Sequence, residues 1–283
     1  MKGWFEWAYR DMLSFFPENV STFGAQLDGL FSFVYWISVL IFLLTYFLLI
    51  AFIIKYRAQP NRKSYHFHGS NIVEFTWTIL PTFLFVGIGL FSEDAWTKTK
   101  YQMKVPKPDV EVDVMAYQFG WQIRYPGPDG IFGKKDRNQM SKMNLFGLDS
   151  NDVNGKDDII IENAQLHLPI NKNVVVNLST ADVLHSFFLP NFRVKQDALP
   201  GKWIKVWFNG TKAGKYEIAC AELCGSNHYA MRGEIFMYSQ QDYDKWLDGK
   251  NKTMLELQQK MKAEQEAATA ATTSDSTATT QGS

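Results

Sequence analysis

Twelve consecutive residues in the second half of the sequence gather sulfur and imidazole side chains at short intervals. The run begins at Cys220 and ends at Met231, with Cys224 and His228 between them. Thiolate, thioether and imidazole groups are soft or borderline ligands, of the kind that copper and zinc centres take. The spacings of four, four and three residues, with Gly225 inside the run, predict a loop that wraps around a compact metal centre.

A second imidazole extends this candidate ligand set. His185 lies near a strand-like run, where a neighbouring loop can bring it beside the first four groups. A single blue-copper site needs one thiolate, two histidines and an axial methionine. Here one thiolate is left over, which argues for two coppers bridged by both sulfurs.

Two other uses of these residues remain open. Cys220 and Cys224 are the only cysteines, and a local disulfide between them is sterically possible outside the cell. It would leave His228 and Met231 unexplained. A structural zinc site would be closed and tetrahedral, but its usual signature has paired ligands two to four residues apart in each half.

The composition excludes two further classes of site. Lys and Arg number 29 and so do Asp and Glu, so no basic excess points to a nucleic-acid partner. The Cys-x-x-Cys-His signature of covalent haem attachment does not occur in the sequence. We therefore expect no nucleic acid and no haem on this chain.

Two apolar runs precede the ligand residues. Residues 31–54 carry no charge, and a helix of that length exceeds the roughly 30 Å hydrocarbon thickness. Residues 72–92 are also long enough to span and carry one charge, Glu74, with Pro81 tolerated inside. We predict a transmembrane helical hairpin over 31–94 rather than a buried hairpin of a soluble domain.

The charges around this hairpin predict its orientation. Loop 55–71 holds four bases and no acid, whereas residues 1–30 hold two bases and four acids. Basic loops stay in the cytoplasm, so this multi-pass protein of the inner membrane should have both termini on the periplasmic side. Segment 1–30 is then extracytoplasmic. It shows no signal-peptide pattern, so the first helix is expected to direct insertion.

Residues 95–247 predict an all-β sandwich or barrel, because short β-branched and aromatic runs alternate with Gly, Pro, Asn and Asp. The polar stretch 126–157 is interpreted as an inserted surface loop. In segment 248–283 a helical pattern through about Met261 is followed by a tail, 267–283, that is expected to be disordered. The predicted strands are 110–116, 120–125, 158–161, 165–168, 173–179, 186–189, 203–209, 215–220 and 233–238.

The ligand loop resembles that of a known family. Residues 220–231 read CAELCGSNHYAM, and subunit II of cytochrome c oxidases carries Cys-x-Glu-x-Cys-Gly-x-x-His-x-x-Met. Three further runs are similar to segments of this family, and the resemblance covers most of residues 31–238. These runs are DVLHSF at 182–187, VKQDALPG at 194–201 and VEFTWTILP at 73–81.

The resemblance implies a two-helix transmembrane hairpin with an all-β, cupredoxin-like Greek-key domain that holds the dinuclear copper centre CuA. The side chain of Glu222 would help to hold a magnesium ion shared with subunit I. The implied copper ligands are bridging Cys220 and Cys224, terminal His185 and His228, the weak ligand Met231 and the main-chain carbonyl of Glu222.

The resemblance also implies a function. As subunit II of a proton-pumping cytochrome c oxidase, the chain would pass electrons from a c-type cytochrome to the haem of subunit I, where oxygen is reduced to water. Subunit I and subunit III would be its partners in the membrane. Glu74 matches a glutamate at the mouth of a proton path, although an acid there can also lie among lipid headgroups. His66, His68 and His167 are interpreted as solvated or hydrogen-bonded.

One departure from the family concerns the electron donor. The family shows Gln-Trp-x-Trp, whose first Trp takes up electrons, whereas this chain has Gln118-Phe119-Gly120-Trp121. Phe119 and Trp121 are the candidates for electron uptake. The residues after 94 carry about one net positive charge, which gives no acidic field to steer a basic soluble cytochrome. We expect a donor that is tethered or held in a supercomplex.

Two other functions would use similar ligands. A CuA electron-transfer subunit of a nitric oxide reductase would carry the same loop, and its partner subunit would distinguish it. A membrane-anchored copper metallochaperone would need neither a basic hairpin with Glu74 nor an aromatic strand for electron uptake. The absorption of a mixed-valence copper pair would distinguish that alternative.

Overall fold

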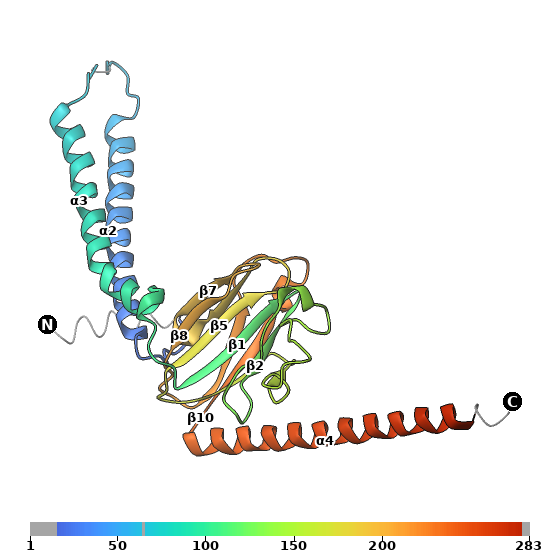
Figure 1. Ribbon diagram of the computed structural model, residues 1–283. Coiled ribbons are helices and arrows are strands. Elements are labelled where there is room, and N and C mark those ends of the chain that lie inside the picture. The colour runs from blue at the N-terminus through green and yellow to red at the C-terminus, as the bar shows by residue number, and fades with distance from the viewer. Residues whose placement is uncertain (1–15, 64–65, 279–283) are drawn as a thin grey trace. The chain divides into compact units, whose positions relative to one another are not determined.

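A computed structural model of the chain describes residues 16–63 and 66–278, which form two compact units (Figure 1). One unit contains the two apolar helices and ends at Lys104. The other contains the described residues from Val105 to Ala278, together with Val20–Thr22.

The helical unit is an antiparallel hairpin of α2 (Gly24–Tyr56) and α3 (Asn71–Lys100). Both helices are long and apolar enough to cross a membrane. They extend beyond the apolar runs that predicted them, because the helical backbone continues into polar flanks whose side chains can reach water. The rings of Phe33 and Phe91 pack 5.8 Å apart between the two helices.

The second unit is a sandwich of two five-stranded sheets, which confirms the predicted all-β class of this segment (Figure 1). In spatial order, the first sheet holds β3 (Ile159–Ile161), β2 (Gly120–Tyr125), β1 (Val110–Tyr117), β5 (Val174–Thr180) and β8 (Ile204–Phe208). The second holds β4 (Gln165–Pro169), β10 (Arg232–Tyr238), β9 (Gly214–Cys220), β6 (His185–Leu189) and β7 (Val194–Ala198). Short 3-10 helices occur at η2 (Gln102–Lys104), η3 (Arg137–Gln139), η4 (Pro190–Phe192) and η5 (His228–Ala230).

One strand was not predicted. β7 has the sequence VKQDA, whose three central residues are polar, and it lies at the edge of its sheet. Edge strands expose one side to solvent, so a polar sequence is compatible with pairing there. β7 pairs with β6, and this pairing places Ala198 opposite His185.

A short N-terminal piece joins the sandwich. Ser21 forms an antiparallel bridge with Gly210, and the Val20 N–H donates to the carbonyl of Asn191 at 2.9 Å. The Val20 side chain is buried. Residues 1–15 of the predicted N-terminal segment 1–30 lie outside the described residues, and residues 16–30 are divided between the two units.

A buried ion-pair cluster lies where the insertion 126–157 meets the first sheet. Arg124 on β2 donates to Asp113 on β1 at 3.1 Å and, through Nε, to Asp158 at 2.9 Å, and all three side chains are fully buried. Arg124 also donates to the carbonyl of Gly133 at 2.7 Å, and Lys135 pairs with Asp113 at 2.9 Å. Because the insertion covers the outer face of β2, every residue of that strand is buried rather than every second one.

Helix α4 (Gln240–Ala278) continues past the predicted helical end near Met261 into the segment expected to be disordered. The difference has a local cause, because residues 262–278 include six alanines, and Ala has the highest helix propensity. The first turns of α4 pack on the sandwich. The ring of Trp246 lies 5.2 Å from Tyr125 and 4.3 Å from His167.

His167 is buried in this aromatic cluster, in keeping with its interpretation as a hydrogen-bonded histidine. Its ring stacks on Phe236 at 4.9 Å, and its Nδ1 lies 3.0 Å from the hydroxyl of Tyr238. Burial, with a smaller contribution from Lys250, lowers the pKa of His167 to about 4.

This low pKa predicts that acid destabilises the second unit, which contains the sandwich and is called the β unit. In the unfolded chain the imidazole of His167 binds a proton below a pKa of about 6.5, whereas in the folded chain it stays neutral until the pH approaches 4. The free energy of unfolding therefore decreases as the pH falls from 6.5 toward 4. The loss should approach about 3 kcal/mol. Chemical unfolding at pH 7 and pH 4.5 should show a smaller difference for His167→Gln than for the parent, and equal differences would contradict this role.

Candidate metal centre

The ligand loop joins two paired strands. β9 ends at Cys220 and β10 begins at Arg232, and the strands run antiparallel with Arg232 opposite Ala219. His185 opens β6, which pairs with β9 through Phe187 and Cys220. The register of three neighbouring strands therefore brings His185 to the end of the sheet where the loop begins.

The candidate side chains form one continuous set of short contacts. The two sulfurs Cys220 Sγ and Cys224 Sγ lie 3.8 Å apart. Cys220 Sγ lies 3.9 Å from His185 Nδ1, and Cys224 Sγ lies 3.5 Å from His228 Nδ1. Met231 Sδ lies 3.8 Å from Cys224 Sγ. Each thiol thus has its own imidazole, and the two thiols face one another.

The donor set fits a pair of soft metal ions. Both cysteines are free thiols, and their sulfur separation far exceeds a disulfide bond of about 2.05 Å. The carbonyl of Glu222 lies 3.2 Å from Cys220 Sγ, so a further oxygen faces the thiols. A closed tetrahedral zinc site would use neither this oxygen nor the Met231 sulfur. Two thiols between two imidazoles fit a bridged copper pair.

Burial affects the protonation of the thiols. Cys224 is buried, and this burial, followed by its contact with Cys220, raises the pKa of the Cys224 thiol to about 11. Metal ligation requires the thiolate, so metal uptake at neutral pH should release a proton from Cys224.

Asp182 is a functional residue that sequence reasoning did not single out. His185 Nε2 lies 2.8 Å from Asp182 Oδ1, so the carboxylate holds the imidazole with Nδ1 toward Cys220. Partial burial would raise the pKa of Asp182, but hydrogen bonds from His185 and from the N–H groups of Gln118 and Val183 outweigh it and lower the pKa. The sequence offered one signal for this role, because Asp182 lies three residues before the candidate ligand His185.

The turn between β1 and β2 packs directly on the ligand loop. Gln118 Nε2 donates to the Cys224 carbonyl at 2.6 Å. Gly225 has a φ of 136°, and a Cβ there would lie only 3.0 Å from the Phe119 ring. Glycine is therefore needed both for the backbone conformation and for this close approach.

The two aromatic candidates for electron uptake differ in exposure. Phe119 is half-buried beside the loop, whereas Trp121 is fully buried. The Trp121 ring lies 6.4 Å from His185 and 5.4 Å from Phe187. Phe119 is therefore the candidate nearer to solvent, and Trp121 lies inside, next to a candidate ligand.

The remaining predicted residues lie in two places, the ligand loop and the helical unit. Glu222 is half-buried in the ligand loop. Glu74 is exposed in the first turn of α3, in the helical unit, and its N–H donates to the Ser70 carbonyl at 3.0 Å. His66 and His68 stack edge to face at 4.5 Å in the loop before α3.

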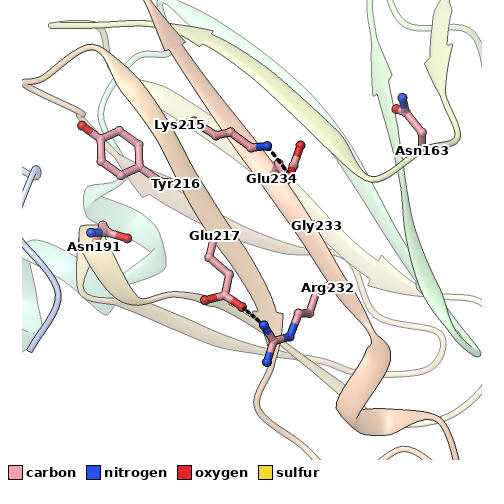
Figure 2. A pocket seen from close by; sticks show the side chains of 8 residues that line it. All are labelled: Asn163, Asn191, Lys215, Tyr216, Glu217, Arg232, Gly233 and Glu234. Atoms are coloured by element: carbon pink, nitrogen blue, oxygen red, sulfur yellow. Dashed lines mark ion pairs between the residues drawn. The ribbon is translucent and has the colours of Figure 1, made fainter.

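The strands that flank the loop carry two ion pairs on their outer face, beside a hollow of about 690 Å³ (Figure 2). Lys215 pairs with Glu234 at 2.5 Å, and Arg232 pairs with Glu217 at 3.4 Å. Exposed pairs of this kind contribute roughly 0–1 kcal/mol. The position of the ligand loop therefore depends on the hydrogen-bond ladder and the core more than on these charges.

Comparison with known proteins supplies independent findings. Residues 112–236 match the family "Cytochrome C oxidase subunit II, periplasmic domain", and residues 10–94 match the transmembrane domain of the same subunit. The alternative cytochrome c oxidase subunit 2 of Bradyrhizobium diazoefficiens is 32% identical over 229 residues, covering 81% of this chain and 82% of that protein. Cytochrome c oxidase subunit 2 of Cereibacter sphaeroides is 29% identical over 241 residues, covering 82% and 78%.

A solved structure is also similar. The crystal structure of the periplasmic domain of cytochrome oxidase subunit II from Bradyrhizobium japonicum is 29% identical. The likeness covers 53% of this chain and 99% of that one, with a TM-score of 0.39.

Proposed function

Because the chain belongs to the cytochrome c oxidase subunit II family, we propose that it is the electron-accepting subunit of a proton-pumping haem-copper oxidase. It is a membrane protein with a cupredoxin-like domain, and it is a subunit of an oxidoreductase complex. In this proposal it takes electrons from a c-type cytochrome and passes them to the haem of subunit I, which reduces oxygen to water.

One observation supports this proposal most strongly: two free thiols face one another at 3.8 Å, each beside its own imidazole. A copper pair bound there would accept and release one electron with little change in its bonds. The residues proposed to hold it are His185, Cys220, Cys224, His228, Met231 and the Glu222 carbonyl.

The chain's own residues would tune this centre. Asp182 keeps His185 in the tautomer whose Nδ1 is free to bind. The burial of Cys224 and Met231 excludes water from one side of the set. Gln118 holds the Cys224 carbonyl, which fixes the loop against the turn that carries Phe119. The Glu222 side chain is proposed to reach a magnesium ion shared with subunit I.

The orientation follows from the charges of the loop between the helices. Because segment 55–71 is basic, we place it in the cytoplasm, with the termini and the sandwich on the periplasmic side. Subunits I and III would pack beside the hairpin of α2 and α3. The donor is proposed to be tethered or complex-bound.

A direct experiment tests the function. The purified full chain, loaded with copper, should hold two copper ions per chain, and its electron paramagnetic resonance should show one unpaired electron shared between both nuclei. A single copper with a localised electron would refute the dinuclear assignment. Co-purification with a nitric oxide reductase instead of an oxygen-reducing subunit I would refute the assigned complex.

Glu74 is proposed to take up protons for the assembled oxidase. Glu74→Gln keeps the shape of the side chain and removes its ionisable proton. Steady-state oxygen consumption should fall severalfold while the copper absorption stays unchanged. Glu93→Gln, the same change near the other end of α3, is the matched control and should leave turnover unaltered. Equal turnover of both variants would place Glu74 among the lipid headgroups instead.

If the electron donor is tethered or complex-bound, electrostatic attraction between a soluble cytochrome c and the sandwich should be weak. Reduction by a basic soluble cytochrome c should be slow and only weakly salt-dependent, because no acidic excess concentrates it at the sandwich. Phe119→Trp should preserve transfer from the native donor, since an aromatic ring remains beside the ligand loop. Fast reduction by the soluble cytochrome with a steep loss on adding salt would contradict a tethered donor.

A further inference from the structure

We propose that the end of α2, residues 57–63 after it and Phe67 form a binding site for the phosphate of an anionic phospholipid. The loop bends beside the end of α2 and borders a hollow of about 990 Å³. Three cationic side chains line this hollow together with three aromatic ones, namely Arg57, Arg62, Lys63, Phe52, Tyr56 and Phe67.

One of the three cations around the hollow, Arg62, is held in place by contacts that do not neutralise its charge. Arg62 Nη1 donates to the Lys55 carbonyl at 2.5 Å, and its guanidinium lies 5.5 Å from the centre of the Tyr56 ring. These contacts orient Arg62 and leave other guanidinium N–H groups available. In the part of the chain that the structure describes, none of the three lining cations pairs with a carboxylate, and neither does Lys55 at the end of α2.

The aromatic residues indicate the depth of the site. Phe52 and Tyr56 lie in the last turns of α2, and Phe52, Tyr56 and Phe67 are more than half exposed. Aromatic rings and snorkelling cations are typical of the level of the lipid headgroups. An anionic lipid bound here would set its phosphate against Arg57 and Arg62 and lay its acyl chains along α2. Basic pockets at this membrane face bind such headgroups in other proteins.

A simpler explanation is that these charges only direct insertion. That explanation requires positive charge in the loop but no particular side-chain arrangement. The hollow, the fixed Arg62 and the aromatic lining are additional features that a lipid site would use. The two explanations differ in what they predict for the inserted, purified chain.

Native mass spectrometry of the full chain in detergent can measure this binding. The probe is phosphatidylglycerol, compared with phosphatidylcholine of the same acyl chains. The parent should prefer phosphatidylglycerol, and the double variant Arg57→Gln with Arg62→Gln should lose roughly tenfold or more in its affinity. Arg57→Lys with Arg62→Lys, which retains the charge, should keep most of it. Lys104→Gln with Lys107→Gln, an equal loss of charge outside the loop, is the matched control.

Several results would overturn the site. These are equal affinity for the two lipids in the parent, equal loss in the matched control, and displacement of the lipid by inorganic phosphate at similar concentration, which would indicate a free-anion site. If the double Gln variant does not insert, Ala58→Glu places a carboxylate in the hollow and should weaken phosphatidylglycerol binding alone. Unchanged copper absorption in every variant separates this outcome from failure of the copper proposal.

Discussion

Cys220→Ser is expected to remove the shared-electron spectrum of the copper-loaded chain and to lower its copper content below two ions per chain. Cys220 Sγ contacts Cys224 Sγ, His185 Nδ1 and the Glu222 carbonyl. It is therefore the sulfur that links His185 to the other donors. A serine oxygen is harder than a thiolate, and it cannot replace a soft sulfur shared by two coppers.

The control for this variant is Ser226→Ala in the same loop. Ser226 is exposed, so its loss should leave copper content and spectrum unchanged. Copper content is measured by elemental analysis, and electron sharing by paramagnetic resonance and visible absorption. If Cys220→Ser retained the spectrum, the two sulfurs would not act as a bridging pair, whatever else the loop binds.

Arg124→Met is expected to destabilise the β unit by about 3–5 kcal/mol, the usual effect of removing one partner from a buried ion pair. The arginine lies between Asp113 and Asp158, and none of the three side chains is exposed. Its removal leaves two carboxylates without their main cation in a site that water does not reach. Burial already raises the pKa of Asp158 against the pull of Arg124.

Arg232→Met is the matched control, because it removes an arginine whose side chain is 73% exposed and pairs with Glu217. Its effect should stay below about 1 kcal/mol. Chemical unfolding of both variants at neutral pH measures the difference. Similar midpoints for the two variants would mean that the Arg124 cluster does not stabilise the junction between the insertion and the first sheet.

The ligand loop and most of the strands could be predicted from the sequence. Donor types and spacing identified the ligand loop, because its groups lie within twelve residues and need only local folding. Of the ten strands in the described residues, nine were predicted from composition and turn residues, with small shifts at their ends. The missed strand β7 has polar central residues, and its pairing with β6 is what makes it a strand.

Other features depend on partners that are distant in the sequence. The Gln118 N–H reaches Asp182 across 64 residues, and Arg124 reaches Asp158 across 34. Contacts between residues so far apart in the sequence leave no local pattern. The hydrogen bonding of Asp182, which holds His185, and the ion pairs that join the insertion to the first sheet were therefore not predicted. The packing of Trp246 on His167 is a tertiary contact of the same kind.

The pairing of β6 with β9 has a consequence for the order in which the metal centre can form. The cysteines, His228 and Met231 come together by closing a short loop, at little entropic cost. His185 lies 35 residues before Cys220 and reaches it only when Phe187 pairs with that residue. A nascent chain can therefore offer four of the five side-chain donors before the sandwich exists. His185 can join the other donors only after β6 has paired with β9, so a metal centre that includes His185 indicates a folded sandwich.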